Sequence, residues 1–127
     1  MGDDDQEEGI PGLVVYRFYG PLIFANVGYF IERLQGFIDQ QKQPVRRVVI
    51  DARAISSVDF TAMEKLRPFL LKLKEQGIEL AIARAHLPLR EVNIDTGMEP
   101  IFSKDEIFVR VSDAVRAFSE QQQGNGA

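Results

Sequence analysis

The sequence contains no cysteine and no tryptophan among its 127 residues, and it has a single histidine. Without cysteine the chain has no disulfide, no thiolate metal ligand and no cysteine nucleophile, which is compatible with a reducing cytoplasm. Its 15 lysines and arginines are outnumbered by 19 aspartates and glutamates, which gives a net charge of -4. Nucleic-acid binding is disfavoured, because a phosphate backbone requires a clustered basic surface.

The sequence also lacks segments that would place it in or on a membrane. No run approaches the roughly 18 to 20 apolar residues that a membrane span requires. The N-terminus, MGDDDQEEG, is acidic where a signal peptide would be basic, and Gln6 stands where a myristoylation signal needs serine or threonine. We therefore expect the chain as given to be soluble.

Catalytic and cofactor motifs are equally scarce. There is no glycine-rich phosphate loop, no metal-spaced cluster of His, Asp and Glu, and no nucleophile–base pair. Asp51 ends a strand as the phosphoacceptor of a receiver domain does, but the further acids and the lysine of that chemistry are not recognisable. His86 directly follows a strand, a position where a lone histidine is more often structural or solvated than a ligand. We predict that the chain is not an enzyme and holds no cofactor or metal.

What the chain does have is 45% hydrophobic content, enough for one folded domain. Residues 1–10 form an acidic stretch with nothing to bury, which predicts a disordered linker. Residues 122–127 are equally short of core-forming side chains and predict a disordered tail. The folded domain is therefore expected to span residues 11–121.

Strand and helix periodicities alternate along this domain. Strands are predicted over 12–20, 22–24, 46–51, 78–83 and 107–111, and helices over 26–43, 61–76, 86–97 and 112–121. Gly20-Pro21 predicts a turn between the first two strands, Asn26 and Ser112 are expected helix caps, Pro68 interrupts its helix and Gly77 ends it. The order predicts an α/β fold with a mainly parallel central sheet, an N-terminal hairpin and about four flanking helices.

Three segments of the chain resemble one family. They are PGLVVYRFYGPLIFANVGYFIERL (residues 11–34), VVIDARAISSVDFTAMEKL (48–66) and GIELAIAR (77–84). Together they cover nearly all of the folded domain and resemble the STAS domain, especially the version at the cytoplasmic C-terminus of SulP-type (sulfate permease family) anion transporters. The "VYR" strand leading through a "PLxFAN" turn into a helix favours this transporter branch.

The resemblance implies a function that composition does not. A STAS domain of this type is a regulatory and interaction domain on the cytoplasmic face of the inner membrane, and its partner is the transmembrane domain of the same secondary transporter. Sulfate is the expected anion for the family, a cytosolic regulatory protein is a further partner, and full-length members are commonly dimers. Two alternatives stay open: a free-standing phosphoprotein like the anti-sigma-factor antagonists, or a nucleotide-sensing module with weak nucleotide binding.

The candidate regulatory site is the loop before the second long helix, with Asp59, Thr61 and Glu64. In anti-sigma-factor antagonists the corresponding segment reads Asp-Ser-Ser-Gly, and a kinase phosphorylates its second hydroxyl residue. Here the segment reads Asp59-Phe60-Thr61-Ala62, which keeps a hydroxyl at the phosphoacceptor position. A simpler interpretation is a capping box, in which Thr61 caps the helix and Glu64 reaches back to it. Asp59 would then be a loop acid attracted by the positive helix end.

Overall fold

The computed structural model describes residues 10–85 and 102–126. Its central sheet has the strand order β1 (Leu13–Arg17), β2 (Arg47–Asp51), β3 (Glu79–Ala83) and β4 (Ile107–Phe108). Each pair of neighbouring strands in this sheet is parallel, so all four strands end at the same edge. The predicted α/β fold with a parallel central sheet is confirmed.

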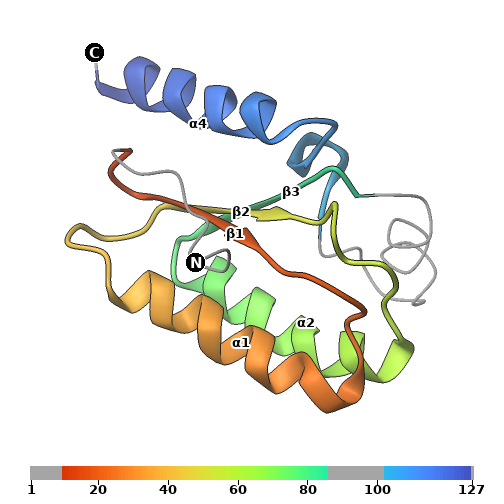
Figure 1. Cartoon of the computed structure of the whole chain (residues 1–127). Helices are drawn as coiled ribbons and strands as arrows, with labels where there is room; N and C mark the ends of the chain where they lie inside the picture. Colours follow the sequence, from red (N-terminus) through yellow and green to blue (C-terminus); the bar gives the residue numbers. More distant parts are fainter. Residues whose placement is uncertain (1–9, 86–101, 127) are drawn as a thin grey trace.

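Helices cover both faces of the sheet (Figure 1). Helices α1 (Phe24–Asp39) and α2 (Phe60–Glu75) lie on one face, and α4 (Val111–Gly126) lies on the other. A short 3-10 helix, η2 (Lys104–Glu106), precedes β4. Within the described residues, no helix has both the length and the apolar character needed to cross a membrane.

The central residues of β1, β2 and β3 are apolar, as expected for strands buried on both faces. Alternate residues of β1 face opposite layers: Val14 and Tyr16 belong to the core against α1 and α2, whereas Leu13 and Val15 belong to the core against α4. In the larger core the Tyr16 hydroxyl donates a hydrogen bond to the Phe30 carbonyl at 3.2 Å. This contact satisfies the polar end of a side chain that is otherwise buried.

The predicted N-terminal hairpin is wrong. Strand β1 pairs with β2 in parallel, and Leu22, expected in a returning strand, forms a parallel bridge with Val58. Gly20 has a φ of +99° and turns the chain toward α1 without reversing it. The backbone groups that a hairpin would have paired are instead satisfied by the loop that follows β2, to which the amides of Gly20 and Leu22 both donate.

The helices differ from their predicted positions at their ends. The described residues contain three α-helices rather than about four, and the predicted helix 86–97 lies outside those residues. Helix α1 begins at Phe24, so Asn26 is inside its first turn; there it accepts from the Ile23 amide and donates to the Pro21 carbonyl. Helix α2 contains Pro68 and stops before Gly77, whose φ of +88° suits the predicted stop.

The C-terminal strand and helix are also shifted. Strand β4 is limited to Ile107–Phe108, and α4 begins at Val111, so Ser112 lies within the helix rather than capping it. The backbone of α4 continues to Gly126, beyond the position where the sequence placed the end of the folded domain. The domain bounds 11–121 themselves stay a prediction.

Candidate functional site

Two loops at the C-terminal edge of the sheet are hydrogen bonded to each other. The first connects β1 to α1 and the second connects β2 to α2. The amides of Gly20 and Leu22 donate to the carbonyls of Ala54 and Ser57, each at 2.8 Å, and the Asp59 amide donates to the Leu22 carbonyl at 3.1 Å. The pairing extends the β1·β2 ladder beyond the sheet and places the first turns of α1 and α2 next to each other.

Asp59 is the N-cap of α2. Its backbone is extended, with φ -92° and ψ 162°, and its Oδ1 accepts a hydrogen bond from the Ala62 amide at 2.8 Å. The same oxygen accepts from the Thr61 hydroxyl at 3.0 Å. The Ala62 amide is the main reason that the pKa of Asp59 is lowered, with further contributions from the Thr61 hydroxyl and the Phe24 amide. Asp59 is therefore ionised at neutral pH and faces the positive end of the helix.

The predicted capping box at Thr61 is wrong. Helix α2 begins one residue before Thr61, so Thr61 lies inside the first turn and its hydroxyl donates to the cap rather than acting as the cap. The carboxylate of Asp59, two residues earlier, already accepts the hydrogen bond from the Ala62 amide. Thr61 and Glu64 are both exposed, with Glu64 one turn further along the helix. The structure brings Asp59 and Thr61 together; their regulatory role stays a prediction.

Large apolar side chains surround this position. Phe24 is 58% exposed and Phe60 is 59% exposed, at the first residues of α1 and α2. Ile23 precedes Phe24 and is also exposed, and the ammonium group of Lys65 lies 5.3 Å from the centre of the Phe24 ring. We call Ile23, Phe24, Asp59, Phe60 and Thr61 the helix-start junction. It combines exposed aromatic surface with an ionised carboxylate and a hydroxyl.

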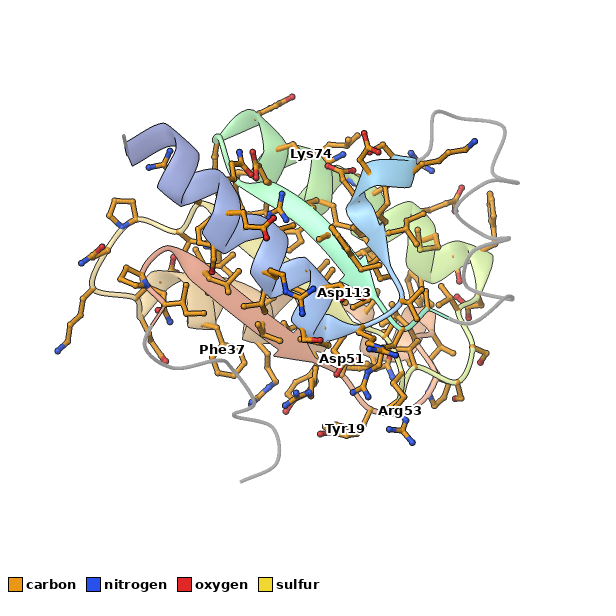
Figure 2. The ribbon with its side chains drawn as sticks, turned by 90° about the horizontal axis from the view of Figure 1, so that it is seen from above. Tyr19, Phe37, Asp51, Arg53, Lys74 and Asp113 are labelled. Atoms are coloured by element: carbon orange, nitrogen blue, oxygen red, sulfur yellow. The ribbon has the colours of Figure 1, made fainter. Side chains whose placement is uncertain are left out.

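A second group of charged residues lies at the same edge of the sheet and was not predicted. Asp51, the last residue of β2, is only 2% exposed, and its Oδ2 contacts Nε of Arg17 at 2.8 Å and Nη2 of Arg84 at 2.6 Å. Its Oδ1 accepts from Nε of Arg84 at 3.0 Å and from the Arg53 amide at 3.2 Å. Figure 2 shows Asp51 and Arg53 with Tyr19 at the end toward which β1 and β3 point.

These contacts determine the charge of Asp51. Burial by itself would raise the pKa of this carboxyl, but the hydrogen bonds from Arg84, Arg17 and the Arg53 amide outweigh it, so the pKa is lowered. Asp51 is therefore a permanent anion at neutral pH. A receiver-type phosphoacceptor would have to present its carboxylate to a metal and a phosphoryl donor, whereas the oxygens of Asp51 are occupied by arginines.

A sequence signal for this cluster existed. Strands β1 and β2 end in Arg17 and Asp51, and Arg84 directly follows β3, so three adjacent parallel strands each lead into a charged residue. Parallel strands bring such residues to one edge, which makes the ion pairs predictable once the strand order is known. His86, the other residue considered for a ligand role, lies outside the described residues. In the part of the chain that the structure describes, no group of His, Asp and Glu side chains could hold a metal ion.

Known proteins resemble this chain over most of its length. Residues 6–114 match the STAS domain family. A probable sulfate transporter of Mycobacterium tuberculosis is 36% identical over 118 residues, which are 93% of this chain and 21% of that protein. The chain thus spans about a fifth of the length of the curated relatives it matches.

Solved structures share the fold at low sequence identity. The murine Slc26a9 anion transporter in its inward-facing state superposes with a TM-score of 0.76 at 18% identity, over 87% of this chain and 18% of that one. The STAS domain of a SulP transporter from Vibrio cholerae gives 0.72 at 16% identity, over 91% of this chain and 88% of that one. The unphosphorylated anti-sigma factor antagonist SpoIIAA gives 0.69 at 14% identity, over 91% and 96%. At these identities the likeness concerns the fold alone.

Proposed function

The chain belongs to the STAS domain family, and from that premise we propose that it is the cytoplasmic regulatory and interaction domain of a SulP-type secondary anion transporter, with sulfate as the transported anion. The observation that carries the proposal is the 36% identity to a probable sulfate transporter across 93% of this chain. The aligned region, 93% of this chain, includes both loops of the helix-start junction as well as the core. The domain would then act by contacting its own transmembrane domain or a cytosolic regulator.

The helix-start junction supports an interaction role. Its phenylalanines are more than half exposed although they occupy the ordered first turns of two helices. Exposed aromatic side chains are enriched at protein interfaces, where they bury large apolar areas at low entropic cost. We propose that this junction and the exposed face of α2 form the contact surface.

Thr61 offers a way to control that surface. The Thr61 hydroxyl oxygen lies 3.0 Å from Oδ1 of Asp59. A phosphate on that hydroxyl would carry close to two negative charges and would lie beside the ionised Asp59 carboxylate. The positive helix end favours a phosphate, but the repulsion from Asp59 opposes it. The loop would then rearrange, and a partner held against Phe24 and Phe60 would bind more weakly.

Uptake of labelled sulfate tests the proposed function. The complete open reading frame that encodes this chain is expressed in bacteria deficient in sulfate uptake, and uptake is compared with that of the same frame lacking residues 11–121. We expect an upstream membrane domain, sulfate uptake by the intact protein, and reduced uptake after the deletion at equal membrane abundance. A reading frame without any membrane domain would contradict the proposal, as would uptake that the deletion leaves unchanged.

The second candidate function is that of an anti-sigma-factor antagonist, because the chain shares the fold of SpoIIAA and keeps a hydroxyl in the helix-start junction. It predicts a free-standing reading frame and stoichiometric phosphorylation of Thr61 by an anti-sigma-factor kinase from the same organism. Mass spectrometry after incubation with that kinase and ATP distinguishes this function from that of a transporter domain. The Thr61→Val variant, which has no hydroxyl, is the matched control.

A further inference from the structure

A basic surface at the C-terminal edge of the sheet contrasts with the acidic chain around it. Two open depressions share Arg17 and Arg84 there. The first, of about 500 Å³, is also lined by Arg110 and Arg116 at the start of α4, together with Val111, Ser112 and Val115. The second, of about 390 Å³, is also lined by Tyr19, Asp51, Arg53 and Ala54. We call the five arginines the arginine edge: Arg17, Arg53, Arg84, Arg110 and Arg116.

Ion pairs between described residues involve several of these arginines. Asp51 pairs with Arg17 and Arg84, and Asp113 lies 3.5 Å from Arg116. Within the described residues these ion pairs involve two acids and three of the five arginines, in a chain whose total charge is -4. The ion pairs with Asp51, which connect three neighbouring strands, explain the positions of Arg17 and Arg84. They do not explain the other three arginines, all of which are exposed around the same depressions.

The backbone at Arg84 gives independent evidence of a functional constraint. Its φ is +61°, which makes Arg84 the non-glycine residue with a positive φ among the described residues. A side chain in this left-handed region costs roughly 1–2 kcal/mol relative to glycine. With this backbone conformation Arg84 makes a bidentate contact with Asp51, and such outliers cluster at binding sites. The carboxylate thereby fixes the orientation of the guanidinium at the rim of both depressions.

We propose that the arginine edge binds a divalent tetrahedral oxyanion, sulfate or phosphate, in the depression between Arg17, Arg84, Arg110 and Arg116. Guanidinium groups donate paired hydrogen bonds that match the spacing of sulfate and phosphate oxygens. Arg17 and Arg84 enter the site already oriented by Asp51, whereas Arg110 and Arg116 are exposed and close around the anion from α4. The anion places its negative charge among exposed guanidinium groups.

Nuclear magnetic resonance titration of the 127-residue chain tests the proposal. Sodium sulfate, sodium phosphate and sodium chloride are added at matched ionic strength, because screening alone shifts resonances near charged groups. We expect saturable shifts with sulfate and phosphate at the arginine Nε–H groups and at the amides of residues 110–116. Chloride should give only small, unsaturated shifts. Equal responses to all three salts would overturn the proposal.

Substitutions assign the binding to the arginine edge. Arg110→Gln and Arg116→Gln remove exposed charges and should preserve the fold, whereas Arg46→Gln removes an exposed arginine that takes no part in either depression. The double variant should weaken sulfate binding about tenfold or more, since hydrogen bonds to a charged partner are lost. Arg46→Gln should leave the binding unchanged. Unchanged binding in the double variant would overturn the proposal.

Binding to lipid vesicles distinguishes a lipid headgroup from a soluble ion as the source of the oxyanion. Co-sedimentation is measured with vesicles that contain phosphatidic acid, whose phosphomonoester can carry two charges, and with phosphatidylcholine vesicles. If the double variant loses binding to the anionic vesicles as well as to free sulfate, a lipid headgroup can occupy the site; if only free sulfate depends on the arginines, the ligand is a soluble ion. Both readouts use the isolated chain, so their failure is distinguishable from failure of the proposed transport function.

Discussion

Arg84 holds the carboxylate of Asp51 at two points, with Nε 3.0 Å from Oδ1 and Nη2 2.6 Å from Oδ2. Arg17 reaches Oδ2 of the same carboxylate at 2.8 Å. One buried acid thus joins residues at the ends of three neighbouring strands. Arg84 makes this contact from a left-handed backbone, so a favourable side-chain contact and an unfavourable backbone conformation occur at the same residue.

Arg84→Ala and Arg84→Gly separate these two energies. Both substitutions remove the contact with Asp51, but only glycine accepts a φ of +61° without strain. We therefore expect the glycine variant to be more stable than the alanine variant by about 1 kcal/mol in urea unfolding. At Glu32, exposed within α1, the same pair of substitutions should give the opposite order, because glycine is a poor helix former. An alanine variant as stable as the glycine variant would contradict the left-handed backbone.

The stability of the chain should fall in acid. The pKa of Asp51 is lowered in the folded chain, so the unfolded chain takes up this proton first as the pH decreases. The stabilisation from the arginine contacts should be complete above about pH 5 and should be lost progressively below about pH 4. Melting temperatures measured from about pH 5 downward, to well below about pH 4, report the loss.

Asp51→Asn provides the comparison for that measurement. It should unfold more easily at neutral pH by about 1–3 kcal/mol, a figure reduced from that for a fully buried pair because both arginine side chains are one-third exposed. Its acid dependence should be weaker but not absent, since the pKa values of Asp59 and Glu79 are also lowered. An unchanged acid slope in Asp51→Asn would show that Asp51 does not carry the effect.

The sequence predicted the layers of the fold better than its connections. Periodicity located the helices α1 and α2, because the burial of apolar side chains along one face of each helix is what that periodicity records. Gly20-Pro21 suggested a hairpin, since turn residues do not specify whether the next segment returns along its own strand or pairs with a distant loop. Val58, the partner of Leu22, is remote in sequence, and only the assembled sheet brings the two together.

The candidate site was predicted to a similar extent. The loop was located, because it follows a buried strand and precedes an amphipathic helix. The cap was assigned to the wrong residue, since Asp59 and Thr61 both satisfy the rules for an N-cap and their competition is decided by where the helix starts. The Asp51 contacts depend on the strand order and on an unusual φ at Arg84, and a local sequence pattern predicts neither of these features.

Asp59 rather than Thr61 should control the stability of α2. Asp59→Ala leaves the Ala62 amide without its acceptor and should lower the melting temperature by about 3 to 5 °C. Asp59→Asn, which keeps a capping oxygen, should lower it much less. Thr61→Ala removes an exposed hydroxyl that donates to the cap and should have a smaller effect than Asp59→Ala. The reverse order of the two alanine variants would mean that the helix starts at Thr61 after all.

A charge at Thr61 should act on transport without unfolding the domain. In the full-length protein, proposed above to be a transporter, Thr61→Glu places a second carboxylate beside the ionised Asp59, and the helix-start junction should rearrange to separate them. We expect sulfate uptake to fall several-fold for Thr61→Glu and for Phe60→Ser, which removes exposed aromatic surface. Thr61→Gln, which matches glutamate in shape but has no charge, should retain uptake.

The controls for this experiment separate a local effect from a general one. Lys42→Glu changes the net charge more than Thr61→Glu does. Lys42 lies after α1, at the end of the domain opposite the helix-start junction, so this substitution should leave uptake unchanged. Membrane abundance and the melting temperature of each isolated variant are measured alongside, because a misfolded domain would also lower uptake. If Thr61→Glu and Phe60→Ser transport sulfate at the unmodified rate, Asp59 and Thr61 serve only to start α2, and the contact surface must lie elsewhere. If Thr61→Glu fails while Thr61→Gln and Lys42→Glu transport normally, charge at this one hydroxyl position is what the transporter detects.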